Sequence, residues 1–316
     1  MPDLITLGET MVLLTPSFQG PLEEASLFLR SLGGAESNVA IGAARLGTSV
    51  GWVSRLGKDP FGSYILKRIR GEGVDTSRVQ LDPSYPTAVM FKEIKAKGNP
   101  HVYFYRKGSA FSRIKPDDLD ESYLSQARIL HITGIAPALS QSSRETIYAA
   151  VEIARKHRVK ISLDPNIRLK LWSIEEAREV LLDLASRCDY FLPGEEELNL
   201  LFATTDRQEW MKRVQAMNLP CTVAKLGEEG CMVIDGNGCR AIPGFPVDQV
   251  VDTVGAGDGF AAGFLHAVIQ GLSVDEAARI ANAVGARCVT VMGDVEGLPT
   301  REELDQFMGR TAQIDR

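Results

Sequence analysis

Short apolar runs alternate with longer segments of helical periodicity over most of the sequence, and this alternation limits the possible folds more than any other feature. From about residue 116 onward, strand-like runs such as 127–134 and 160–166 are separated by helical segments such as 140–159 and 173–188. Such alternation predicts an open, mostly parallel sheet wrapped by helices. In these sheets ligands bind at the carboxyl ends of the strands. We therefore expect the chemistry in three loops that follow strands: 164–168, 225–230 and 253–258.

Two β-rich stretches, at about 10–34 and 86–110, interrupt the alternation. Within the second, residues 87–108 predict a β-hairpin that turns at Gly98-Asn99-Pro100. Neither stretch fits a simple succession of strand and helix. We expect them to form a small secondary sheet that lies over the main one.

Composition and charge exclude several classes of protein. Hydrophobic residues make up 44% of the chain and charged residues 24%, which is typical of a soluble globular protein. The net charge of -6, without a long basic run, argues against wholesale binding to nucleic acid or to an anionic membrane. The five cysteines are scattered without a C-x-x-C pair, which argues against a disulfide framework or a zinc site. We see no signal peptide and no apolar run near the ~18 residues of a membrane span, and expect a cytoplasmic protein.

The run VDTVGAGDGFAAGF (251–264) contains the strongest candidate site. Gly255, Ala256 and Gly257 can present successive N–H groups to a phosphate oxygen at the start of a helix. Asp258 would then lie within reach of a substrate hydroxyl and could accept its proton during phosphoryl transfer. The alternative is a glycine-rich turn with a capping aspartate. The sequence contains no P-loop, and no G-x-G-x-x-G follows the first strand, so a dinucleotide dehydrogenase is improbable.

Other polar residues suggest an anionic, polyhydroxylated ligand. In HVYFYRKGSA (101–110), a strand would place Tyr103 and Tyr105 on one side and Arg106 on the other. Tyrosines beside cations suit such a ligand, although a solvated edge strand explains the pattern equally well. Asn38 lies at another helix start, in GGAESNVAIG (33–42). Arg168, just past a strand end, is a candidate bidentate clamp for an anion.

The carboxylates of LPGEEE (192–197) follow a strand and could hold a hydrated Mg²⁺. Negative charge in the first turn of a helix is an equally good explanation of these residues. The four histidines show neither metal-ligand spacing nor a nucleophile partner. The sequence alone therefore leaves a metal site open.

Taken in order, the motifs resemble the ribokinase-like (PfkB) carbohydrate kinase family over essentially the whole chain. The motifs are the N-terminal GE, GGAESNVA, the β-rich insertions, DPNIR, KLGEEG, DTVGAGDGFAAGF and ANAVGA. The resemblance implies a single kinase domain over 1–316, with a three-layer α/β/α fold, a central mostly parallel sheet and a small β-sheet lid, the β-clasp. It also implies ATP and Mg²⁺ as cofactors, with a potassium requirement left open, and a homodimer formed through the β-clasp.

Within the family, GGAESNVA, YFYRKGSA and GDVEGLP look most like the 2-keto-3-deoxygluconate kinases. This likeness implies a phosphotransferase with an alcohol group as acceptor, which phosphorylates the C6 hydroxyl of that sugar acid. A fructokinase or another sugar kinase of the family is the alternative within the enzyme class. A non-catalytic sugar-acid-binding protein that kept the fold is the alternative from another class.

The resemblance also implies roles for individual residues. Asp258 looks like the base that deprotonates the substrate alcohol, in an anion hole formed by Gly255, Ala256 and Gly257. The positions that resemble the sugar-acid site are Gly34, Asn38, Tyr103, Tyr105, Arg106 and Arg168. Those that resemble the ATP site are Asn166, Lys225, Gly227, Gly230, Gly257 and Asn282. Two residues depart from the family pattern. Gly194 replaces the asparagine of the N-x-x-E element, which leaves Glu197 as the candidate metal ligand. Met90 stands in the lid strand where a tyrosine is expected.

Overall fold

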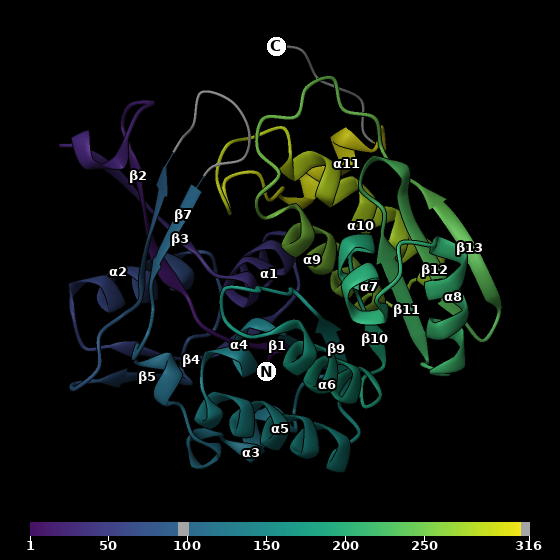
Figure 1. The fold of residues 1–316 in the computed structure, drawn as a ribbon, viewed down its shortest axis with the longest axis horizontal. Helices are drawn as coiled ribbons and strands as arrows, with labels where there is room; N and C mark the ends of the chain where they lie inside the picture. The colour runs from purple at the N-terminus through teal and green to yellow at the C-terminus, as the bar shows by residue number, and fades with distance from the viewer. Residues whose placement is uncertain (94–100, 311–316) are drawn as a thin grey trace.

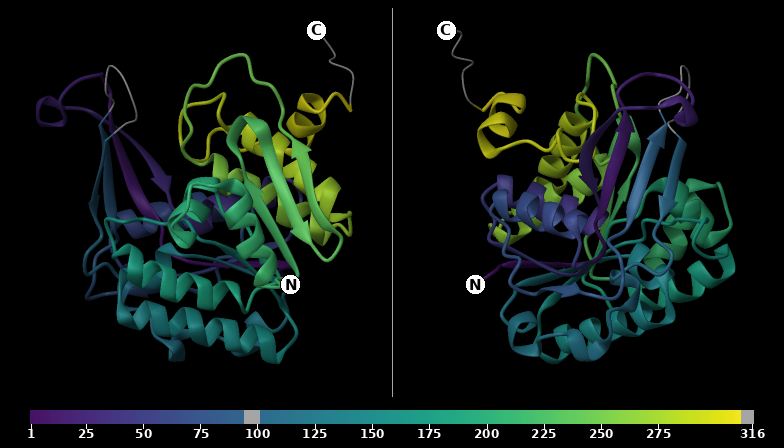
Figure 2. Two further views of the ribbon diagram at one scale, coloured as in Figure 1. Left: turned by 45° about the vertical axis from the view of Figure 1, so that its right-hand side comes forward. Right: turned by 90° about the vertical axis from the view of Figure 1, so that its left-hand side faces the viewer.

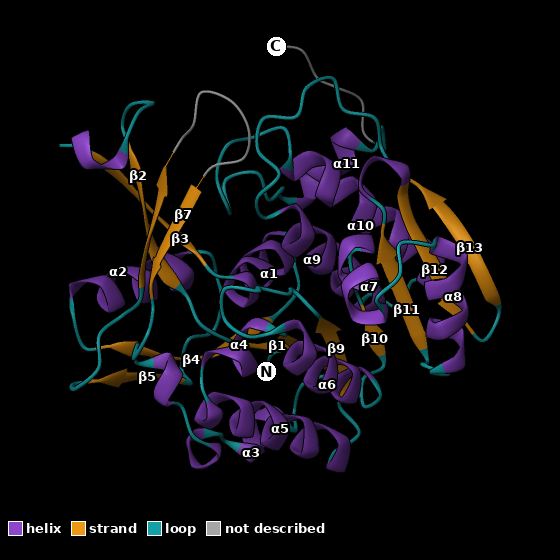
Figure 3. Ribbon diagram, in the orientation of Figure 1, coloured by secondary structure: helices purple, strands orange, loops and turns teal. Residues whose placement is uncertain are grey.

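The computed structural model describes residues 1–93 and 101–310. In these residues the main sheet has nine strands, in the order β13-β12-β11-β10-β9-β8-β1-β4-β5. All neighbours from β11 to β5 are parallel, and only the β11–β12 and β12–β13 pairs are antiparallel. The strands are β1 (Leu4–Leu7), β4 (Val50–Gly57), β5 (Val79–Asp82), β8 (Ile129–Thr133), β9 (Lys160–Asp164), β10 (Tyr190–Phe191), β11 (Cys221–Lys225), β12 (Gly230–Asp235) and β13 (Gly238–Pro243). The predicted open, mostly parallel sheet is therefore confirmed (Figure 3).

Helices cover both faces of this sheet (Figure 1). One hydrophobic cluster packs against α1 (Ala35–Arg45), α2 (Pro60–Gly71), α9 (Ala256–Ile269), α10 (Val274–Cys288) and α11 (Arg301–Phe307). A second cluster packs against α3 (Glu121–Leu124), α4 (Ile135–Leu139), α5 (Gln141–Lys156), α6 (Ile174–Ala185), α7 (Glu195–Phe202) and α8 (Arg207–Ala216). Successive residues of a strand point to opposite faces, so Leu4 of β1 joins the first cluster and Ile5 joins the second. The expected three layers, helix on sheet on helix, are confirmed.

Local sequence signals fix two helix ends, the start of α2 and the end of α1. Asp59 precedes α2, and its Oδ1 accepts a hydrogen bond of 2.7 Å from the Gly62 amide, as expected for an N-cap. Pro60 occupies the first helical position, where its missing N–H costs nothing. Gly47 follows α1 with a φ of 97°, a conformation that favours glycine at a helix end.

A separate sheet of four strands, in the order β3-β2-β6-β7, forms the lid. Its strands are β2 (Met11–Pro16), β3 (Phe28–Gly33), β6 (Val89–Glu93) and β7 (His101–Tyr105). Both β-rich insertions contribute, which confirms the expected secondary sheet, and Figure 2 shows this sheet standing apart from the main one. The turn predicted at Gly98-Asn99-Pro100 lies outside the described residues.

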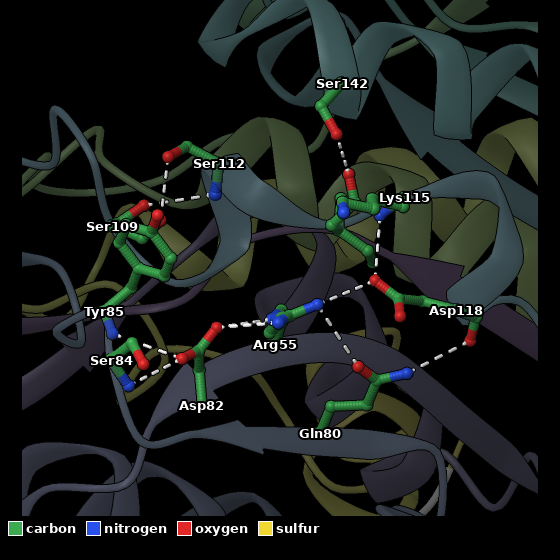
Figure 4. Close-up of polar contacts among 11 residues, drawn as sticks. Arg55, Gln80, Asp82, Ser84, Tyr85, Ser109, Ser112, Lys115, Asp118 and Ser142 are labelled. Atoms are coloured by element: carbon green, nitrogen blue, oxygen red, sulfur yellow. Dashed lines mark hydrogen bonds and ion pairs between the residues drawn. The ribbon is translucent and has the colours of Figure 1, made fainter.

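Polar contacts fix the segment that leads from β5 into β6 of the lid (Figure 4). Arg55 of β4 forms ion pairs with Asp82, at 2.7 Å, and with Asp118, at 2.8 Å. The same Asp82 accepts hydrogen bonds from the amides of Ser84 and Tyr85, just before β6. The base of the lid is thus tied to the main sheet by charge-assisted bonds.

In the described part of the chain no helix is long and apolar enough to cross a bilayer. All five cysteines are free, as their spacing predicts, and all except Cys239 are buried. Burial raises the pKa of Cys231 to about 12, so this thiol stays protonated and unreactive.

Candidate active site

The lid and the carboxyl ends of the main strands enclose a cavity of ≈ 420 Å³. Met90, Phe104 and Arg106 line it from the lid. Asp164 lines it from the end of β9, and the turn before α9 completes the wall at Gly255. The cavity therefore lies at the strand ends, where the alternation of strands and helices predicts ligand binding.

The glycine turn before α9 is shaped by one left-handed residue. Gly255 is the N-cap of α9 with a φ of 80°, and a Cβ atom there would come within 2.4 Å of the Asp294 carbonyl oxygen. The first amides of a helix lack intrahelical acceptors and can bind an anion. Gly257 and Asp258, in the first turn of α9, line the cavity. The turn can therefore bind a phosphate beside the Asp258 carboxylate.

Asp258 has the electrostatic properties of a general base. Burial raises its pKa to about 7, and the Asp164 charge adds to this rise. A hydrogen bond of 2.8 Å from Asn38 Nδ2 to Asp258 Oδ2 opposes it, as do the charges of Arg168 and Lys225. A carboxylate whose pKa lies near neutral pH is well matched to accepting a proton from an alcohol.

The start of α1 supplies two further polar groups. Asn38 lines the cavity, and its Oδ1 is buried without a hydrogen-bond partner within the described residues. Glu36 also lines the cavity, and its Oε1 accepts a hydrogen bond of 2.6 Å from Thr133 Oγ1. Burial raises the pKa of Glu36 to about 7. Asn38 was predicted from the sequence but Glu36 was not, because a glutamate in the first turn of a helix has an ordinary explanation.

Lys225 lies beside the glycine turn. Its Nζ is 2.6 Å from Asp164 Oδ2, and 3.6 Å from the place that a Cβ would take at Gly257. Burial disfavours its charged form, but the carboxylates of Asp164 and Glu197 outweigh burial and hold the pKa of Lys225 above its usual value. Lys225 therefore remains charged where phosphate would bind.

Both oxygens of Glu197 are occupied by backbone amides. Oε1 accepts from the Ile167 amide at 2.8 Å and Oε2 from the Gly194 amide at 2.7 Å. Burial, with the nearby Asp164 charge, raises the pKa of Glu197. Within 1–93 and 101–310, no three His, Cys, Asp or Glu residues gather as a metal site. This donor set does not fit a metal held directly by protein carboxylates; it fits a hydrated Mg²⁺ that is bound mainly through substrate phosphates.

The two candidate arginines differ in their pairing. Arg106 is buried and forms an ion pair of 2.7 Å with Glu9, which also accepts from Ser109 Oγ. Arg168 lines the cavity and donates to the Ile167 carbonyl oxygen, but pairs with no carboxylate in the described part of the chain. Arg168 therefore has the charge available for an anionic ligand. Glu9 was missed, although it lies two residues after β1, near a strand end where ligands are expected.

Several predicted residues lie outside the cavity wall. Tyr103 and Tyr105 lie on the face of β7 opposite to that of Phe104 and Arg106, which line the cavity. The Tyr103 hydroxyl donates a hydrogen bond of 3.1 Å to Glu93 Oε2. The Tyr105 side chain is 68% exposed. The side-chain amide of Asn282 donates to the backbone oxygens of Ile242 and Pro243, both at 3.0 Å, and joins α10 to β13. The other predicted residues that do not line the cavity are Gly227, Gly230 and Ala256.

The remaining predicted residues do meet at the cavity. They are Gly34, Asn38, Arg106, Asn166, Arg168, Glu197, Lys225, Gly255, Gly257 and Asp258. Asn166 has a φ of 39°, and its Oδ1 is buried without a hydrogen-bond partner among the described residues. Asp294 was missed: it lines the cavity, its Oδ1 has no partner in the same ranges, and burial raises its pKa to about 6.

Comparisons with known proteins agree with this geometry. The 2-dehydro-3-deoxygluconokinase of Bacillus subtilis (strain 168) is 40% identical over 308 residues, which cover 97% of this chain and 95% of that protein. Fructokinase-1 of Oryza sativa subsp. japonica is 32% identical over 315 residues, covering 96% and 97%. Among solved structures, a putative ribokinase II from E. coli in complex with ATP and Mg²⁺ is 27% identical with a TM-score of 0.91, covering 98% of this chain and 100% of that one.

A 2-dehydro-3-deoxygluconokinase from Thermotoga maritima is 26% identical with a TM-score of 0.89, covering 98% and 100%. A family model described as pfkB family carbohydrate kinase matches residues 1–301. The match spans the lid, the cavity and the turn that carries Asp258. The chain therefore belongs to the pfkB family of carbohydrate kinases.

Proposed function

We propose that the protein transfers the γ-phosphoryl group of ATP to the C6 hydroxyl of 2-keto-3-deoxygluconate. The observation that carries the proposal is Arg168, whose charge meets no carboxylate partner in the described residues and faces the same cavity as Asp258. A guanidinium group binds a carboxylate through parallel hydrogen bonds, which suits a sugar acid better than a neutral sugar. The relative at 40% identity supports the same substrate.

In the proposed reaction, Asp258 accepts the proton of the substrate hydroxyl. The Asn38 amide holds the carboxylate through its bond to Oδ2, and its own Oδ1 orients a sugar hydroxyl. The amides at the start of α9, with Lys225 beside them, stabilise the negative charge on the transferred phosphoryl group. The lid excludes water from the cavity, which limits hydrolysis of ATP. Bound Mg²⁺ would supply a further positive charge to the phosphates.

One observation favours a second candidate, a fructokinase. Glu9 balances the charge of Arg106, so the described part of the lid presents no unpaired arginine to the cavity. A neutral sugar is compatible with such a lid, and a fructokinase is among the relatives at 32% identity.

The decisive experiment measures ADP release with Mg-ATP and 2-keto-3-deoxygluconate, fructose, ribose, gluconate or no sugar. We expect the keto-deoxy acid to give the highest kcat/KM. The variant Arg168→Ala should raise the KM for this acid about 10- to 100-fold, since a hydrogen bond to a charged group contributes about 1.5–3 kcal/mol. The same variant should change the KM for a neutral sugar little.

Two results would contradict the proposal. Faster turnover of fructose than of the acid would retain Asp258 as base and reject the substrate. Stoichiometric binding of the acid without ADP release would show a binding protein that kept the fold of a kinase.

A further inference from the structure

A buried ion pair connects the lid to the loop that carries the glycine turn. Lys92, on β6, places its Nζ 2.6 Å from Asp252 Oδ2. Both side chains are only 8% exposed. Met90, two residues before Lys92 and therefore on the same face of the strand, lines the cavity together with it. The contact thus joins a cavity-lining strand of the lid to the segment just before the glycine turn.

Asp252 in turn holds two backbone segments in place. Its Oδ1 accepts a hydrogen bond of 3.1 Å from the Val254 amide, within the turn that leads to Gly255. Its Oδ2 accepts one of 3.3 Å from the Gly293 amide, in the loop after α10. That loop packs directly on the turn, because the Asp294 carbonyl oxygen leaves no room for a Cβ at Gly255. The position of the phosphate-binding amides therefore depends on Asp252.

A carboxylate that is almost fully buried needs a compensating charge. Removing one partner of a buried ion pair leaves the other charge without compensation, which is strongly unfavourable. Asp294, a second buried carboxyl group, lies close enough for Lys92 to favour its ionised form as well. Without Lys92, two acidic side chains would face each other across the turn and the loop that it contacts.

We infer that Lys92 is a positioning residue for phosphoryl transfer: from the lid it holds Asp252, and through Asp252 it holds the turn at Gly255 where phosphate binds. The lid that encloses the sugar therefore also aligns the amides of the anion hole. Lys92 acts through Asp252 and does not itself take part in the reaction. The inference rests on the sugar kinase activity proposed above.

The test compares Lys92→Met, Lys92→Arg, Asp252→Asn and the double variant Lys92→Met/Asp252→Asn. The control is Lys107→Met, which removes an exposed lysine that lies two residues after β7 of the lid. Steady-state rates are measured with the sugar that the wild-type protein phosphorylates fastest, so a wrong substrate assignment leaves this test intact. Thermal unfolding of the same proteins needs no substrate and reports the ion pair independently of catalysis.

We expect Lys92→Met to lower kcat on the order of 10- to 100-fold, as a misaligned reactive group does, with the KM for ATP changed less than about threefold. Lys92→Arg should recover most of the activity because it keeps the positive charge. The double variant should lose no more than either single variant, in kcat and in melting temperature, because the two residues act as a pair. Lys107→Met should match the wild type.

The inference is overturned if folded Lys92→Met keeps kcat within twofold of the wild type, or if the single losses multiply in the double variant. A lysine that only stabilised the lid would lower the melting temperature and raise the KM for sugar while leaving kcat unchanged. If Lys92→Met does not fold, the other single variants decide. Wild-type-like turnover of Lys92→Arg together with a loss in Asp252→Asn supports the inference, and any other combination rejects it.

Discussion

The hydrogen bond from Asn38 to Asp258 should set the pH at which phosphoryl transfer becomes efficient. A general base works only in its ionised form, so activity should fall as the pH drops through the pKa of Asp258, about 7. Burial raises this pKa, and the Asn38 amide, at 2.8 Å from Asp258 Oδ2, opposes the rise. The variant Asn38→Ala removes a donor that stabilises the carboxylate. The pKa should then rise, and the acid limb of the pH profile should move to higher pH.

The size of the shift follows from the strength of the bond. A hydrogen bond to a charged group contributes about 1.5–3 kcal/mol, and about 1.4 kcal/mol corresponds to one pKa unit. Complete loss of the bond would therefore move the acid limb by about 1–2 pH units. Water that enters the space left by the amide restores part of the interaction, so we expect a shift of about 1 unit.

The assay is kcat/KM for the sugar between about pH 5.5 and about pH 9 with saturating Mg-ATP. The control is Ser37→Ala, because the Ser37 hydroxyl donates to the Gly34 carbonyl oxygen at 2.9 Å and belongs to the same turn of α1. This control should leave the acid limb in place. If Asn38→Ala lowers the rate equally at every pH, Asn38 does not tune the base and the reasoning fails.

Two further predictions concern Asp258 and Gly255. Asp258→Asn should lower kcat about 10²- to 10⁴-fold. It should also unfold at a higher urea concentration than the wild type at pH 8. The pKa of Asp258 in the folded state, about 7, exceeds its ordinary value of 3.8, so the stability of the wild type falls as the pH rises between these two values. The asparagine variant does not titrate and escapes this loss. Equal urea midpoints at pH 8 would contradict the burial of this charge. Gly255→Ala should abolish ADP release. Backbone strain at this positive φ should lower the free energy of unfolding by about 1–3 kcal/mol, and the clash of the new Cβ with the Asp294 carbonyl oxygen should lower it further. Gly47→Ala, also at positive φ but with open space around it, should be destabilised less and remain active; equal effects would contradict the clash.

The sequence predicted the main sheet because parallel strands are buried on both faces and therefore read as continuous apolar runs, as in Leu4–Leu7. It also separated Tyr103 and Tyr105 from Arg106 correctly, since side chains alternate along a strand. It could not tell which side of β7 faces the cavity, because a period of two is the same for both faces. That choice depends on where the whole lid sheet lies.

The ion-pair partners of charged residues could not be predicted from the sequence either. Glu9 lies 97 residues from Arg106, and Asp252 lies 160 residues from Lys92. Nothing local to either residue encodes such a pairing. The side-chain amide of Asn282, which the family resemblance assigns to the ATP site, likewise meets two backbone carbonyl groups that only the tertiary structure brings within its reach.

The side chains that line the cavity have a consequence for its selectivity. Among the described residues, its wall holds six carboxyl groups and only four cations, and burial raises the pKa of four of these acids. The cavity thus has little spare positive charge, and under the proposed reaction a nucleotide phosphate would meet mainly backbone amides and Lys225. We therefore expect a nucleotide to bind together with its own counter-ion. Under the proposed reaction, one arginine suffices for a singly charged sugar acid, whereas the phosphate ester adds charge that the wall does not balance. We therefore expect the product to bind more weakly than the substrate.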